Sequence, residues 1–195
     1  MSLFVGLLIV LGALVVYALT IYNKFVTSKT RIKASIQEIG NQLKRQSGLI
    51  PNLVQSVKGY MKHEKSIFTE ITQARKGVTS ALKSGNVQKM IDAGNKLQTA
   101  LSPINAIFES TPELKAAQPT VKMMDELRDT ADKIMYSRRT LIDLTADYNV
   151  MVETVPSKFI AMIFGFKQEP GLKMPKDGQH IEVSEAETKN PKVKL

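Results

Sequence analysis

The sequence predicts an all-α protein, with an N-terminal transmembrane helix followed by an antiparallel up-and-down four-helix bundle. Three observations predict this fold. The stretch from Leu3 to Ile21 carries no charge, and beyond it apolar residues recur at spacings of three and four. No alternating segment bounded by turn residues suggests a strand. Amphipathic helices joined by short turns bury their apolar faces best as a bundle.

The uncharged stretch is long enough to cross a bilayer, since a helix needs roughly 20 apolar residues to span the hydrocarbon core. A secretory signal peptide is the alternative, but no basic residue precedes the stretch and no small-x-small cleavage site follows it. A basic cluster comes directly after it, formed by Lys24, Lys29, Arg31 and Lys33. The positive-inside rule therefore predicts an outside N-terminus and a cytoplasmic remainder. The expected location is the inner membrane of a bacterium.

The chain is basic, with 27 Lys and Arg against 18 Asp and Glu and a formal net charge of +9. Next to an anchor, this surplus favours membrane lipid as a partner. Each residue of the basic cluster could gain about 1 kcal/mol near an anionic leaflet. The alternative, that the cluster only determines topology, stays open. Nucleic acid is not expected, because no aromatic platforms are interleaved with the basic residues.

Two helices are expected in the first half of the bundle. The first continues the anchor to about Gln46, where Ser47 and Gly48 interrupt the apolar pattern. Pro51 then suits the first turn of the second helix, which ends at the turn 84–86. The second helix would be roughly 50 Å long and the first about 39 Å, so one of these boundaries is expected to be wrong by a turn or two.

Two further helices and a tail complete the prediction. A third helix carries the apolar stripe from Val87 to Phe108, and Pro103 should kink it or weaken its last turns. The fourth and longest helix runs from Met124 to Val155. After Phe166 the composition becomes polar and rich in Pro and Gly, which favours disorder. The expected organisation is an anchor (1–21), a bundle domain (22–166) and a disordered tail (167–195).

Several segments resemble the LemA family. The run 42–54, QLKRQSGLIPNLV, is similar to that family's QLKRRxDLIPNLV, and 57–64, VKGYMKHE, to its VKGYxxHE. Later matches include Tyr148 and Asn149 (its YN), Pro156, and the FGF element 164–166. Departures include Thr111 where the family has tyrosine. The resemblance covers residues 22–166 of a divergent member and implies a single-pass membrane protein with a helical-bundle domain, without a settled biochemical activity.

Catalytic and metal-binding signals are lacking. His63 and Glu64 form half of a metal-binding helix, but HExxH requires a second histidine at Ile67, and a di-iron bundle requires two ExxH motifs. No nucleophile elbow, P-loop or dinucleotide fingerprint occurs, and the chain has no cysteine. We therefore expect no enzyme, cofactor or metal, and a surface or capping role for His63.

The family-like block supplies the first candidates for protein interaction: Lys44, Arg45, Ile50, Pro51, Asn52, His63 and Glu64. Lys44 and Arg45 are too far along the first helix to reach lipid, so their expected partners are solvent, carboxylates of the second helix or another protein. The alternative is that the block around Pro51 only makes the turn between the first two helices.

The segment before the tail is unusually apolar, with Phe159, Ile160, Met162, Ile163, Phe164 and Phe166. Counting helices places it beside the bilayer. It is too short to span, but it could lie in the interface with Lys158 and Lys167 reaching the headgroups. The alternative is that its side chains close the open end of the bundle core.

Two classes of function remain. The favoured one is a non-enzymatic scaffold or adaptor that recruits cytoplasmic or membrane proteins, with a homo-oligomer through exposed helix faces left open. The other is a lipid-binding or membrane-remodelling protein that acts through its basic and aromatic membrane-proximal segments.

Overall fold

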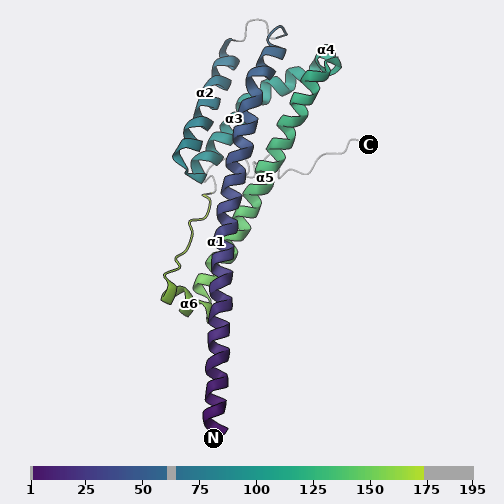
Figure 1. Ribbon diagram of the computed structural model, residues 1–195. Helices are drawn as coiled ribbons and strands as arrows, with labels where there is room; N and C mark the ends of the chain where they lie inside the picture. The colour runs from purple at the N-terminus through teal and green to yellow at the C-terminus, as the bar shows by residue number, and fades with distance from the viewer. Residues whose placement is uncertain (1, 61–64, 174–195) are drawn as a thin grey trace, which may run out of the picture.

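The computed structural model describes residues 2–60 and 65–173. In these ranges the regular structure is entirely helical, which confirms the predicted all-α class. An apolar helix projects from one end of a helical bundle (Figure 1). The helices are α1 (Ser2–Val57), α2 (Lys65–Ser84), α3 (Val87–Ser110), α4 (Pro112–Ala116), α5 (Gln118–Glu153) and α6 (Ser157–Phe164).

The longest element, α1, joins the apolar stretch to the bundle. It is one helix of 56 residues, about 84 Å long at 1.5 Å per residue. Its most apolar window has a mean hydropathy of 2.7, and none of that window is buried by the rest of the chain. From Phe25 onward the same helix supplies core residues, including Ile39 and Leu43, which are fully buried. The apolar stretch and the bundle core are therefore parts of one helix, without a linker.

The predicted break after Gln46 is wrong, because α1 continues through Ser47, Gly48 and Pro51 to Val57. The buried side chains keep one heptad phase across this region: Ile32, Ile39, Leu43, Ile50, Leu53 and Val57. Their burial outweighs the local cost of a glycine and a proline inside a helix. The first helix therefore ends eleven residues later than predicted, at Val57 instead of Gln46. Its part beyond Ile21 is about 54 Å long and α2 is about 30 Å long, so the length mismatch is the reverse of the expected one.

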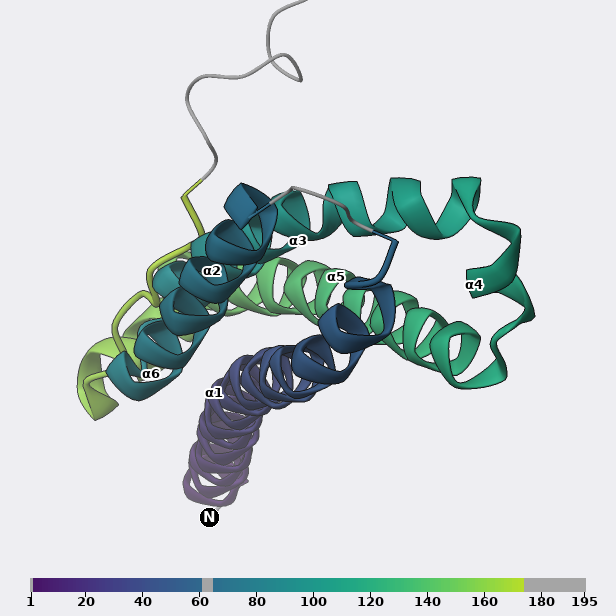
Figure 2. The same ribbon diagram turned by 90° about the horizontal axis from the view of Figure 1, so that it is seen from above.

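The chain direction alternates through the bundle, as predicted. The α2–α3 hairpin covers the half of α1 distal from the apolar stretch, and α5 returns along α1 (Figures 1 and 2). Gly85, with φ of +64°, makes the predicted turn between α2 and α3, and the Asn86 side chain accepts a hydrogen bond of 3.0 Å from the Lys89 amide. α3 continues past Pro103 to Ser110, so that proline does not end the helix.

Residues beyond α5 extend the packed part of the chain. α6 lies against α1 and α5 at the end of the bundle nearest the apolar stretch, and residues 167–173 return along the bundle (Figure 1). The Lys173 amide donates a hydrogen bond of 2.9 Å to the Gln88 side chain on α3. The predicted start of the disordered tail at Lys167 is therefore too early. Residues 174–195 lie outside the described part of the chain.

Candidate membrane-proximal site

An aromatic cluster joins α1, α5 and α6 just beyond the apolar stretch. Its members are Tyr22, Phe25, Tyr148, Phe164 and Phe166. The Phe25 ring is stacked on Phe166 with centroids 4.7 Å apart, and meets Tyr148 edge-on at 5.7 Å. Tyr22 lies 4.8 Å from Phe164 and 5.6 Å from Phe166. Such pairs add about 0.5–1.5 kcal/mol each beyond their buried area.

The local backbone at the end of α6 directs Phe164 and Phe166 to this cluster. Gly165 adopts a left-handed conformation with φ of +71°, and the Phe166 amide bonds to the Ala161 carbonyl at 2.9 Å. A glycine in this conformation is a common way for a helix to end. At the other end of α6, the buried Ser157 hydroxyl donates to the Met151 carbonyl at 2.7 Å, which ties α6 to α5.

The two faces of α6 have different surroundings. Ser157 and Ala161 are buried against the bundle, and Ile160 is half-buried there. On the other face Phe159, Met162 and Ile163 are 58%, 71% and 73% exposed. Phe164 touches Tyr22 with its ring but is still 52% exposed. α6 therefore closes the end of the core with one face and presents a large apolar surface with the other.

Two hydrogen bonds and an ion pair hold the segment that follows α6. Both groups of the Asn149 side-chain amide pair with the backbone of Glu169, one accepting from its amide and one donating to its carbonyl, each at 2.9 Å. The Glu169 carboxylate is 2.9 Å from the Lys29 amine. That hydrogen bond raises the pKa of Lys29, although partial desolvation opposes the shift. Residues 167–173 are thereby fastened to both α5 and α1.

Tyr148 is a buried polar residue of this site. Its ring packs against Phe25, and its hydroxyl forms no hydrogen bond within the described residues. Burial raises the pKa of Tyr148, and the nearby Lys29 ammonium partly offsets that shift. Tyr148 therefore stays neutral and acts as a core side chain.

The basic cluster is divided by the structure. Lys29 is paired with Glu169, whereas Lys24, Arg31 and Lys33 are exposed and form no ion pair with any described residue. On a helix normal to the membrane, Lys24 would lie about 5 Å beyond Ile21, within a headgroup layer of about 5–7 Å. The other three would lie about 12–18 Å beyond it.

The part of the family-like block from Lys44 to Asn52 lies within α1, so it does not make the predicted turn. Arg45 forms ion pairs with Glu126 at 3.3 Å and with Asp129 at 3.8 Å. Both carboxylates are on α5, whereas the carboxylates expected as partners were on the second helix. Ile50 is buried in the core. The remaining described members of the block, Lys44, Pro51 and Asn52, are exposed. His63 and Glu64 lie outside the described residues.

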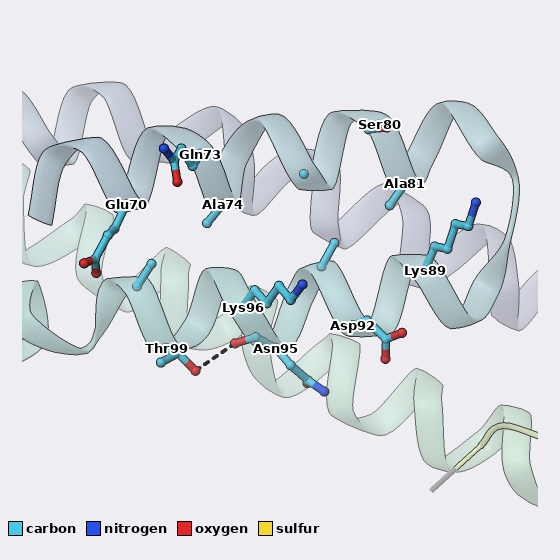
Figure 3. A pocket seen from close by; sticks show the side chains of 13 residues that line it. Glu70, Gln73, Ala74, Ser80, Ala81, Lys89, Asp92, Asn95, Lys96 and Thr99 are labelled. Carbon is cyan, nitrogen blue, oxygen red and sulfur yellow. Dashed lines mark hydrogen bonds between the residues drawn. The ribbon is translucent and has the colours of Figure 1, made fainter. Parts of the chain in front are cut away.

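A second candidate surface is the groove between α2 and α3, with a volume of about 780 Å³. Figure 3 shows Glu70 and Lys89 near its opposite ends, with Lys96 and the hydrogen bond from Thr99 to Asn95 on the α3 side. Small residues make the groove, among them Ala74, Gly77, Ala81, Ala93 and Ala100. Across the described ranges, no three His, Asp or Glu side chains come close enough to hold a metal ion.

Sequence reasoning missed three parts of the membrane-proximal site. Tyr22, Asn149 and Glu169 come from distant parts of the chain, and only the packing of α5 and α6 on α1 brings them together. One signal was available: Tyr148 and Asn149 match the YN element of the LemA family, and Phe164 and Phe166 match its FGF element. The structure places both elements in this membrane-proximal site.

Comparisons with known proteins agree with the resemblance. A model of the LemA family matches residues 35–194 of this chain. The chain is 27% identical over 170 residues to magnetosome protein MamQ of Magnetospirillum gryphiswaldense. It is equally similar to magnetosome proteins MamQ 2 and MamQ 1 of Paramagnetospirillum magneticum. Each match covers 75% of this chain and 62% of the relative, so the chain spans less than two thirds of the length of these relatives.

Proposed function

The chain belongs to the LemA family, and from this premise we propose that it is a membrane-anchored scaffold that recruits other proteins to a cytoplasmic helical bundle. It is a membrane-associated protein with a helical fold. The proposal adds three points: the bundle faces the cytoplasm, it carries no catalytic chemistry, and its partners are proteins.

The continuity of α1 is the observation that carries the proposal. A helix that passes from an exposed apolar stretch into the bundle core couples the bundle rigidly to its anchor. At 1.5 Å per residue, the end of α1 at Val57 lies about 54 Å beyond Ile21. A rigid body held at a set height above a bilayer suits the presentation of binding surfaces.

The cytoplasmic orientation is supported by charge. Lys24, Arg31 and Lys33 remain unpaired among the described residues, on the bundle side of the apolar stretch. The chain has no cysteine, so single cysteines report topology cleanly. In intact cells, Ser184→Cys should resist a membrane-impermeant thiol reagent, and Ser2→Cys should react with it. Rapid labelling of Ser184→Cys would place the bundle on the outer side.

The recruitment of proteins is tested by site-specific photo-crosslinking of the full-length chain in its own membrane. A photoreactive residue at Ser80, in the α2–α3 groove, should give discrete protein adducts. The matched position is Ser102, which is exposed on α3 outside the groove. Adducts that depend on position support the scaffold, and failure of every exposed position to give a protein adduct would refute it.

The alternative function, direct remodelling of the bilayer, is favoured by one observation: the exposed apolar face of α6. Reconstitution of the full-length protein into vesicles of phosphatidylethanolamine and phosphatidylglycerol separates the two. A scaffold should leave vesicle size and permeability unchanged as protein density increases. Tubulation, fusion or leakage in proportion to protein density would instead support remodelling.

A further inference from the structure

The exposed face of α6 is a surface without a partner in the described structure. Phe159, Met162 and Ile163 are each more than half exposed and lie on a single helix of eight residues. Apolar patches of this kind on a protein surface usually mark a site of interaction. Closing the core does not explain them, because Ala161 and Ile160 on the other face, with Phe166 just beyond the helix, already perform that role.

The position of α6 indicates what covers this face. The ring of Phe164 lies 4.8 Å from the ring of Tyr22. Tyr22 directly follows the apolar stretch of α1, which ends at Ile21. α6 is therefore level with the point where α1 would leave the hydrocarbon core. Leu19 and Val26 precede and follow this level along α1, and both side chains are exposed. Lipid that surrounds α1 would also meet α6.

Length and charge fit the interface of a bilayer rather than its interior. Eight residues extend about 12 Å, whereas the hydrocarbon core is about 30 Å thick. Lys158 and Lys167 flank the segment, and no acidic residue occurs between them. The Lys158 amine pairs with the Glu153 carboxylate at 3.3 Å, whereas Lys167 forms no ion pair with any described residue. Amphipathic helices with this arrangement lie in the plane of the interface, with lysines at the headgroups and apolar side chains below them.

α6 is also held in place before any contact with lipid. Its ends are fixed by the Ser157 hydrogen bond to α5 and by the stacking of Phe166 on Phe25. The segment after it is fastened by the Asn149 and Lys29 contacts with Glu169. Because the helix is already folded and oriented, insertion requires little additional ordering.

We propose that α6 is a second, interfacial membrane contact, with Phe159, Met162 and Ile163 inserted among the lipids. This inference rests on the proposed membrane anchoring of α1. Together the two contacts fix the tilt and rotation of the bundle relative to the bilayer, which a single spanning helix would leave free. The partner of this surface is the lipid itself.

The test uses full-length single-cysteine variants with an environment-sensitive fluorophore, in vesicles of phosphatidylethanolamine and phosphatidylglycerol. Ile163→Cys reports on α6. Its matched control is Tyr136→Cys on α5, since both positions are 73% exposed, and Leu11→Cys reports on the anchor. Met162→Cys, 71% exposed, repeats the measurement if the first variant labels or folds poorly.

The expected result is that the Ile163 probe has blue-shifted emission, is quenched by nitroxide-labelled lipid, and is quenched by aqueous iodide several-fold less than the Tyr136 probe. Equal iodide quenching at the two positions would refute the inference. A probe at Ile163 that is shielded from both quenchers would also refute it, because a protein surface or second copy would then cover the face. A Leu11 probe outside the lipid would refute the anchoring itself.

Discussion

Replacing Phe25 by alanine tests whether the aromatic cluster holds the membrane-proximal end together. Phe25 is fully buried, stacks on Phe166 and meets Tyr148 edge-on. Phe25→Ala should therefore weaken both the α1–α5 pair and the attachment of α6. Val26→Ala is the matched control, because its side chain is the next on the same helix and is exposed.

The size of the effect follows from the contacts of this ring. Burial of a phenylalanine contributes about 1.5–3 kcal/mol, and two aromatic pairs add about 1–3 kcal/mol together. This agrees with the loss of about 3–5 kcal/mol that accompanies Phe-to-Ala changes in protein cores. At about 2–4 °C per kcal/mol for a domain of this size, the melting temperature should fall by about 6–20 °C. The control should change the free energy of unfolding by less than about 0.5 kcal/mol.

The assay is thermal and denaturant unfolding of the full-length protein in lipid nanodiscs, followed by far-ultraviolet circular dichroism. Trypsin cleavage after Lys167 gives a second readout, and it should accelerate in Phe25→Ala because the neighbouring Phe166 loses its stacking partner. If Phe25→Ala costs no more stability than Val26→Ala, and cleavage is unchanged, the aromatic cluster does not hold this end of the bundle.

Three further predictions use the same unfolding measurements. Ile50→Ala should lower the free energy of unfolding by about 2–5 kcal/mol because Ile50 is in the core. Arg45→Ala should lower it by less than about 1 kcal/mol because its ion pairs are solvent-exposed, and equal losses would contradict this assignment. Pro51→Ala should raise the free energy of unfolding by up to about 3 kcal/mol, since proline is unfavourable inside a helix, and a lower stability would show that α1 needs the proline. The pKa of Lys29 is raised above the ordinary lysine value of 10.5, so its pairing with Glu169 should stabilise the fold below about pH 10.5. That stabilisation should be lost as pH rises through the folded-state pKa, and Lys29→Met should lack this loss.

The family-like elements acquire physical roles from these contacts. The YN pair supplies Tyr148, which packs on Phe25, and Asn149, which holds the backbone of Glu169. The FGF element supplies Phe164, which touches Tyr22, while its glycine ends α6. These two elements therefore pack on the first residues of α1 after the apolar stretch, from the opposite end of the bundle domain.

The error in the first helix boundary shows how local and tertiary signals can compete. Ser47, Gly48 and Pro51 are a local signal for a break, whereas the heptad phase from Leu43 through Val57 is a signal for one helix. A true break between helices usually shifts that phase, and here it does not shift. The continuity could have been predicted by weighing the phase above the local composition.

The sequence by itself determined the helical class, the apolar stretch, the turn at Gly85 and the return of the chain to the end of the bundle near that stretch. Each of these depends on periodicity or on a residue with a strong local preference. Only the tertiary structure decided which side of α6 closes the core, which lysine of the basic cluster is paired, and that residues 167–173 contact the bundle. These outcomes depend on contacts such as Tyr22 with Phe164 and Lys29 with Glu169, which join residues far apart in the chain and leave no spacing pattern for a sequence to display.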